Sequence, residues 1–206
     1  MPEFSDEAQA AARTKTRLRA VLLARRRSLP VQARAAAAAR VHDELTHLVR
    51  RLRPGRMSAY VPVGREPGGN FLPDVLLATL TPGARLLLPV LRPDLDLDWG
   101  VYGGPGSLIV AGRGMREPAG ERLGPNAIGE ADLVVVPALA VDHRGVRLGR
   151  GGGSYDRALA RVGAGVLTVA LLHDGELVTR LPAQEHDRPV RAVITPSGGL
   201  RVLAYG

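Results

Sequence analysis

The residue types best suited to chemistry stand together in the run Arg147-Leu-Gly-Arg-Gly-Gly-Gly-Ser-Tyr-Asp156. Glycine costs backbone entropy and contributes nothing to a core, but it lets backbone N–H groups converge on an anion. A helix that begins at about Tyr155–Asp156 would add positive charge from its N-terminus, and Arg147 and Arg150 would add guanidinium donors. The alternative is a tight strand-to-helix turn with Asp156 as the helix cap. Because arginine and glycine coincide at a helix start, the pattern favours a phosphate site.

A second group of cations follows helical spacing near the N-terminus. At 100° per residue, Lys15, Arg19, Leu22 and Arg26 fall within one narrow arc. Lys15 and Arg19 are neighbours four positions apart on the rim of the apolar face, beside Leu18. A helix docked by that face would aim both cations along its edge. A solvated basic face would explain the same spacing, so this feature by itself is weak.

Carboxylates stand at three places where they could contact a ligand. Glu66 ends the stretch Tyr60-Val-Pro-Val-Gly-Arg-Glu66, a strand running into a turn. Ligands of open α/β sheets lie beyond the carboxyl ends of the strands. Asp156 and Asp187 could together hold Mg²⁺, which takes one or two carboxylates besides phosphate oxygens and waters. Taken one at a time, the simpler explanations are favoured: an ordinary surface glutamate for Glu66 and a polar turn for Asp187.

Two helices are expected to precede the sheet. Apolar residues, Val21 among them, recur at helical spacing from Thr14 to Ser28, where Leu29–Pro30 interrupts. An alanine-rich helix then spans Val31 to Leu52 and is ended by Pro54–Gly55. The first of these two helices is strongly basic, because Lys and Arg side chains recur along it.

The rest of the chain alternates short apolar runs with turns and helical segments. Several runs are continuous, which is typical of strands buried on both faces of a parallel sheet. Such a pattern predicts an α/β domain. The stretch Arg92–Gly129, dense in Gly, Pro and Asp, reads as a long loop that should cover something. Its single tryptophan, Trp99, could be a stacking surface or a loop plug. The runs are Met57–Val63, Val75–Leu80, Ala84–Val90, Leu133–Val136, Arg157–Val162, Val166–Leu172 and Arg191–Thr195.

Composition bounds the class of protein. At 206 residues and 21.8 kDa the chain suits one domain, which we place at residues 13–206 after a frayed tail at 1–12. The absence of cysteine excludes disulfides, cysteine zinc sites and thiol nucleophiles. No apolar run approaches the roughly 20 residues of a membrane helix, and we expect a soluble, cytoplasmic, monomeric protein.

Charge is unevenly placed. Residues 1–56 hold 13 of the 28 basic and 5 of the 20 acidic side chains, so the whole excess of +8 lies in the first quarter. A basic surplus favours polyanions such as nucleic acid or nucleotide phosphates, or only aids solubility. Because aromatic residues make up 3% of the chain, stacking platforms for single strands are scarce, and nucleic acid is not the expected partner.

Taken in order, these stretches resemble the 5-formyltetrahydrofolate cyclo-ligases, also called methenyltetrahydrofolate synthetases, across nearly the whole chain. No single motif is decisive, but the ordered set is hard to obtain by chance. The motifs are Lys15-x-x-Leu18-Arg19, Tyr60 to Glu66, Leu88-Pro89-Val90, Leu97-Asp-Trp-Gly100, Asp132 to Asp142, Gly145 to Asp156, and Leu181-Pro-x-x-x-His186-Asp187.

The resemblance implies a fold and a reaction. The fold would be a single three-layer α/β domain with a mainly parallel central sheet flanked by helices. The reaction would be the cyclisation of 5-formyltetrahydrofolate to 5,10-methenyltetrahydrofolate, dependent on ATP and Mg²⁺, with release of ADP and phosphate. The implied partners are small molecules, a reduced formyl-folate and ATP.

The resemblance also implies site residues. Arg150 is our first choice for the group that stabilises the transferring phosphoryl, with Lys15 sharing that role. The implied magnesium ligands are Asp156 and Asp187. The implied folate contacts are Val61, Glu66, Arg150, Gly151, Gly152, Gly153 and Ser154. The implied ATP contacts are Lys15, Thr16, Arg17, Leu18, Arg19, Arg147, Leu148, Gly149, Arg150, Gly151, Gly152, Gly153, Ser154 and Tyr155.

The sequence departs from the family pattern at three places. Many members carry Lys at the position of Gly152 and Tyr at that of Ser154, and an acidic residue and Thr often follow the position of Glu66. The missing lysine removes a phosphate donor, so we expect Arg147 and Arg150 to bind the phosphate in its place. Two alternatives stay open: a nucleotide- or RNA-binding module using the basic first helix, and an ATP-dependent enzyme of the same fold acting on another amide.

Overall fold

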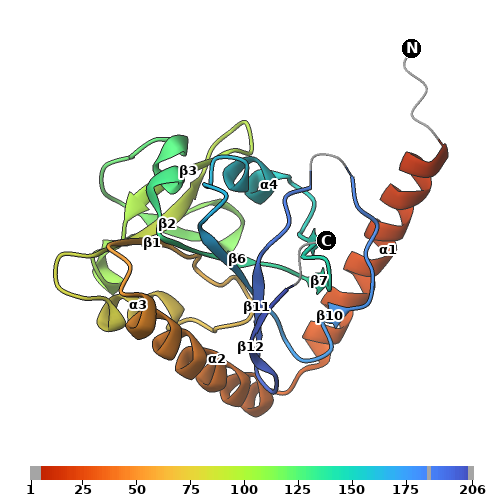
Figure 1. Cartoon of the computed structure of the whole chain (residues 1–206), viewed down its shortest axis with the longest axis horizontal. Coiled ribbons are helices and arrows are strands. Elements are labelled where there is room, and N and C mark those ends of the chain that lie inside the picture. The colour runs from red at the N-terminus through yellow and green to blue at the C-terminus, as the bar shows by residue number, and fades with distance from the viewer. Residues whose placement is uncertain (1–5, 185–186, 204–206) are drawn as a thin grey trace.

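A computed structural model describes residues 6–184 and 187–203. Its frame is a seven-stranded sheet in the order β12-β11-β9-β6-β1-β2-β3 (Figure 1). The inner strands are mutually parallel, while the edge strands β12 and β3 run antiparallel to their neighbours. The strands are β1 (Arg56–Ser58), β2 (Arg85–Leu91), β3 (Leu97–Val101), β6 (Leu133–Pro137), β9 (Leu167–Leu171), β11 (Ala192–Thr195) and β12 (Gly199–Val202). The expected parallel sheet is confirmed.

Helices cover both faces of this sheet. On one face α2 (Val31–Leu52) and α3 (Leu72–Thr79) pack Val41, Leu45 and Leu76 against the strands. On the other, α4 (Ser154–Leu159) and the 3₁₀ turn η3 (Pro125–Glu130) enclose a second cluster. The strands between are apolar on both sides; β6 is buried at four of its five positions. The chain is therefore the expected three-layer α/β domain.

The first helix, α1 (Asp6–Ser28), packs outside these layers. It runs along the small sheet β10-β7-β8 (Figure 1). Leu22 is its buried apolar contact there, in a cluster with Leu139, Leu148 and Leu181. The strands of this sheet are β7 (Ala140–Asp142), β8 (Arg147–Leu148) and β10 (Leu177–Val178). Within the described ranges, no helix is both long and apolar enough to cross a membrane.

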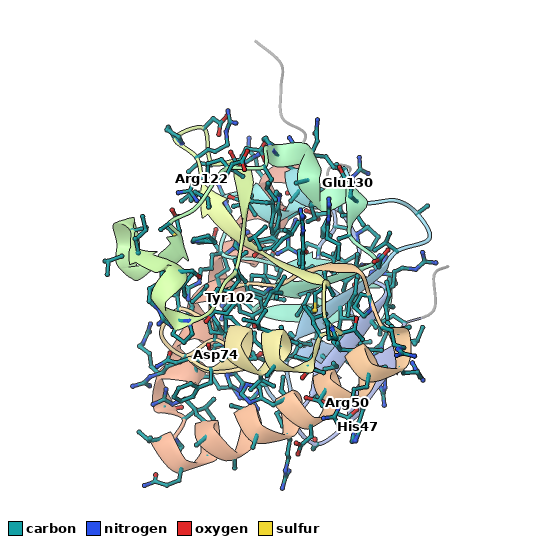
Figure 2. The ribbon with its side chains drawn as sticks, turned by 90° about the vertical axis from the view of Figure 1, so that its left-hand side faces the viewer. His47, Arg50, Asp74, Tyr102, Arg122 and Glu130 are labelled. Carbon is teal, nitrogen blue, oxygen red and sulfur yellow. The ribbon has the colours of Figure 1, made fainter. Side chains whose placement is uncertain are left out.

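The segment 92–129 is structured, and its reading as one long loop is wrong. It contains β3, the hairpin β4 (Leu108–Val110) and β5 (Arg116–Pro118), and the 3₁₀ turns η1 (Pro105–Ser107) and η2 (Gly112–Gly114). Edge pairing with β2 outweighs the low strand propensity of Gly, Pro and Asp. Trp99 is fully buried in the second core cluster, so it acts as a plug. Beyond β3, the Tyr102 hydroxyl donates to Asp74 of α3 at 2.6 Å, and Figure 2 labels this pair.

Two expectations about helices need correction. The expected tail at 1–12 is helical from Asp6 on, because its alanines favour helix and continue into the amphipathic part of α1; residues 1–5 lie outside the described ranges. Val21, expected on the apolar face, is 57% exposed. The buried arc of the helix is narrower than the arc over which its apolar residues are spread, and Val21 lies outside it. The expected bounds of α2 are confirmed: the helix ends at Leu52, and Arg53 follows as its cap in the left-handed conformation, one residue before Pro54.

Candidate active site

A cavity of about 510 Å³ opens at the carboxyl ends of β1, β2 and β6. Its walls come from the segment after β1, the end of β2, the turn after β6, the loop between β8 and α4, and one edge of α1. This is the edge at which parallel sheets bind ligands, and it is where Glu66 was expected to lie. Segments distant in sequence thus contribute to one pocket.

The glycine-rich loop forms one wall, and every residue from Arg147 to Asp156 lines the cavity. Gly151 has φ +106° and Gly153, the residue before α4, has φ +69°, a region that favours glycine. At Gly149 a Cβ would stand 2.7 Å from the guanidinium of Arg147. The loop therefore needs glycine at Gly151 and Gly153, whereas at Gly149 a larger residue would require the Arg147 side chain to shift. The helix begins at Ser154 with Gly153 as N-cap, so Asp156 lies in its first turn and is not the cap.

Two polar atoms of this wall lack a partner among the described residues. They are the Arg147 Nε and the Tyr155 hydroxyl, both buried. The Arg147 guanidinium lies 5.7 Å from the centre of the Tyr155 ring. Burial raises the pKa of Tyr155, so its hydroxyl keeps its proton at neutral pH and remains a donor. Unsatisfied buried donors are rare in native proteins, and two of them on one cavity wall indicate that a ligand completes the site.

The first helix contributes cations, as its spacing predicts. Lys15, Arg19 and Arg26 all line the cavity. Arg19 Nε donates to the Gly149 carbonyl oxygen at 2.9 Å, which ties the helix to the glycine-rich loop. Arg26 is 3% exposed and is the most buried of the three. The remaining residues assigned to nucleotide on this helix, Thr16, Arg17 and Leu18, do not line the cavity, because a helix presents only one side; the first two are exposed and Leu18 packs toward β8.

Glu66 and Arg150 join the segment after β1 to the glycine-rich loop. Arg150 Nε lies 3.0 Å from Glu66 Oε1, and the Val63 amide donates to Glu66 Oε2 at 2.9 Å. Glu66 is thereby fixed while the arginine side chain stays 54% exposed. Beneath them Tyr60 donates its hydroxyl proton to the Pro67 carbonyl, and burial, followed by the charge of Glu66, raises the pKa of Tyr60. Val61 also lines the cavity, so all seven expected folate contacts lie in it.

The two aspartates assigned to metal both line the cavity, each beside a cation. Asp156 Oδ1 accepts from Arg147 at 2.9 Å, and Asp187 Oδ2 accepts from Lys15 at 2.7 Å. His186, part of the same motif, lies outside the described residues. Among described side chains, no group of three or more carboxylates or imidazoles could hold a metal by itself. The donor set fits Mg²⁺ only as a nucleotide complex, in which phosphate oxygens and waters supply most ligands.

Part of the lining was not foreseen from the sequence. The spacing of Arg26 is that of the other cations of its helix, but the sequence gives it no role. The wall formed by the end of β2, the start of β3 and the β4–β5 hairpin had no assigned residue. Pro89 and Leu97 belong to motifs that carried the resemblance, but the motifs gave them no role. The other residues of the wall come from strand ends and from the hairpin of a segment read as a loop, and no motif marks them. The wall residues are Pro89, Leu91, Leu95, Leu97, Met115, Arg116 and Glu117.

The family model and the relatives that match this chain all belong to one enzyme family. Residues 11–196 match the family model described as "5-formyltetrahydrofolate cyclo-ligase family". A 5-formyltetrahydrofolate cyclo-ligase of Mycolicibacterium smegmatis is 44% identical over 196 residues, which cover 93% of this chain and 98% of the relative. The NMR structure of Aquifex aeolicus 5,10-methenyltetrahydrofolate synthetase superposes with a TM-score of 0.77 at 30% identity, covering 93% of this chain and 94% of the other. A 5,10-methenyltetrahydrofolate synthetase from Mycoplasma pneumoniae, 17% identical, shares the fold with a TM-score of 0.67 over 87% and 96% of the two chains.

Proposed function

The chain belongs to the 5-formyltetrahydrofolate cyclo-ligase family, and on that basis we propose that it converts 5-formyltetrahydrofolate to 5,10-methenyltetrahydrofolate while ATP is cleaved to ADP and phosphate. The observation that carries the proposal is the shared cavity. One pocket of about 510 Å³ holds the cations of α1, the glycine-rich loop and the Glu66–Arg150 pair. A triphosphate and a folate can therefore meet in it.

The chemistry requires an activated oxygen. A formamide carbonyl is a poor electrophile, and ring closure must expel its oxygen. In the proposed reaction that oxygen attacks the γ-phosphorus of ATP, and ADP leaves. N10 then attacks the formyl carbon and loses its proton, and the oxygen departs as phosphate. No protein nucleophile is required, so the enzyme has to align two substrates and neutralise charge on the transferring group.

Three cations of the cavity wall have a place in that scheme. Arg147 offers its unpartnered Nε, and Lys15 and Arg19 face the same cavity. Because Lys15 is held by Asp187, it is pre-positioned before a phosphate arrives. Pre-oriented donors cost little reorganisation during the reaction and stabilise charge more than mobile ones do.

Arg150 is proposed as the donor to the phosphoryl in transfer. Its partner Glu66 is the proposed folate contact, so the arginine stands where the two substrates would meet. Glu66 and Val61 would then orient the folate so that its formyl oxygen points toward the glycine-rich loop. The half-exposed Arg150 side chain can change partner from carboxylate to phosphate without disturbing a core.

Magnesium is proposed as part of the nucleotide complex, held by Asp156 and Asp187. When bound it would neutralise charge on the phosphate oxygens. The two carboxylates would keep their present neighbours, Arg147 and Lys15, close to the same oxygens. The Tyr155 hydroxyl, unpartnered and protonated, supplies one further donor in this wall.

An absorbance assay for methenyl-folate, run with and without ATP and with and without Mg²⁺, tests the proposal. We expect product only when both are present. The Arg150→Ala variant should turn over about 10²–10³-fold more slowly with its melting temperature unchanged. Arg201→Ala, an exposed arginine on β12, is the matched control and should behave as the unaltered protein. Near-normal turnover by Arg150→Ala would contradict the assigned role.

The assay also addresses a related alternative, an ATP-dependent enzyme of this fold that acts on another amide. A panel of reduced folates separates the two. If none of them gives ATP-dependent product while ATP is still cleaved in the presence of another amide, the folate assignment fails and the nucleotide site stands.

A further inference from the structure

Glu117 is a buried carboxylate that lines the same cavity as the glycine-rich loop. It lies on β5, in the hairpin with β4, and is 9% exposed. Among the described residues, its side chain has one hydrogen bond, from the Leu91 amide at the end of β2, which donates to Oε1 at 3.0 Å. Around it the cavity wall is mostly apolar, formed by Leu91, Leu97 and Met115.

The surroundings of Glu117 differ from those of the other buried carboxylates. Asp96 pairs with Arg161, Asp142 with Arg144, and Glu176 with Arg26. The carboxylates elsewhere in the cavity also have cations beside them. No described cation lies within ion-pair distance of Glu117, and one backbone N–H is a small compensation for burying a carboxylate. A charged group kept in such a place, on the wall of a cavity, has a ligand as its natural partner.

We infer that Glu117 is a specificity-determining residue, which accepts hydrogen bonds from the amino edge of the pterin ring. This inference rests on the proposed function. The pterin carries its 2-amino group and its N3–H side by side, so that edge offers two adjacent donors. A carboxylate presents two adjacent acceptors, which is the complementary pattern. Each carboxylate oxygen has two lone pairs, so Oε1 can accept from Leu91 and from the ligand together.

The other groups of the two substrates fit Glu117 less well. The glutamate tail of a folate and the phosphates of ATP are anionic and would be repelled. The amino edge of adenine offers one donor beside an acceptor nitrogen, so one carboxylate oxygen would face a lone pair. The pterin also has to bring its formyl group near Arg150, which lines the same cavity. The pterin therefore is the part of the substrates that matches this wall.

The Glu117→Gln variant separates recognition from structure. Its amide oxygen can still accept from Leu91, so the hairpin stays anchored, but its NH₂ would face the pterin donors. We expect the melting temperature to stay the same and the KM for 5-formyltetrahydrofolate to rise about 10–100-fold, while the KM for ATP is unchanged. Glu121→Gln, an exposed glutamate outside this cavity, is the matched control.

An altered substrate makes the test specific. In 2-desamino-2-methyl-5-formyltetrahydrofolate a methyl group replaces the 2-amino group. The unaltered protein should use this analogue with a KM about tenfold or more above that of the parent, and Glu117→Gln should discriminate between the two much less. If the variant keeps the full discrimination, or if its ATP KM rises in place of the folate KM, the inference is overturned. Failure of the unaltered protein to cyclise the parent substrate would instead refute the proposed function.

Discussion

The ion pair between Arg26 and Glu176 offers the sharpest test of how α1 is held on the domain. The two side chains are 4% and 2% exposed. Arg26 donates to both carboxylate oxygens, at 2.8 and 2.7 Å, and to the Ala138 carbonyl at 2.6 Å. Glu176 also accepts from the His173 amide. The pair joins α1 to two segments more than a hundred residues away.

Removing Arg26 would leave the Glu176 carboxylate buried without a cation. Loss of one member of a buried pair costs about 3–5 kcal/mol. We therefore expect Arg26→Met to lower the free energy of unfolding by about that amount, and the melting temperature by about 2–4 °C for each kcal/mol. Arg25→Met is the control: Arg25 is exposed, donates only to backbone carbonyls, and should cost less than about 1 kcal/mol.

Urea unfolding, followed by circular dichroism, measures both values, and a double variant tests the coupling. Glu176→Gln keeps an acceptor for the His173 amide, so the double variant Arg26→Met/Glu176→Gln should be destabilised by much less than the sum of the single variants. Additive losses, or a cost for Arg26→Met as small as that of Arg25→Met, would refute the reasoning that burial makes this pair interdependent.

Three further predictions follow from the site. Lys15→Ala should raise the KM for ATP, whereas Arg17→Ala, two positions along on the exposed side, should leave it unchanged. Equal KM values for the two variants in the methenyl-folate assay would contradict the proposed nucleotide site. Gly152→Lys should fold normally and tighten ATP binding, because φ of Gly152 is not in the left-handed region and the atom nearest to a new Cβ is the Ser154 hydroxyl at 3.4 Å. Gly151→Lys should be impaired in folding and ATP binding, because φ of Gly151 is +106°. Calorimetric ATP titrations of both variants check this. Because burial raises the pKa of Tyr60, its proton is kept in the folded state when the unfolded chain has lost it, so stability should fall as pH rises above about 10. Tyr60→Phe should make that fall shallower in urea unfolding at alkaline pH, and an unchanged slope would speak against the cause given.

The helices and the buried strands could be predicted from sequence because local signals are strong there. Both bounds of α2, Val31 and Leu52, follow from helical spacing between a proline and a turn. The runs 133–136, 166–172 and 191–195 lie within two residues of β6, β9 and β11. The three cations of the α1 arc face the cavity, because 100° spacing constrains a helix surface whatever it packs against.

What could not be predicted depends on contacts between distant segments. The partner of Arg26 stands 150 positions away, and nothing near Glu176 marks it. The pairing of β3 with β2 decides the structure of a stretch whose composition is that of a loop. Glu117 enters the cavity only because the hairpin folds back on the end of β2. Sequence spacing identifies the residues of the glycine-rich loop, but the wall opposite is a product of tertiary structure.

The chain has a single lysine, Lys15, whose side chain is 8% exposed in the cavity wall, against Asp187. Apart from the N-terminal amine, a reagent that acylates amines therefore meets no target on the outer surface. A nucleotide carrying an acylating group on its phosphate would label one defined position, and free ATP would shield that position. Mass spectrometry of the labelled peptide would then count occupied sites directly, without any measurement of turnover.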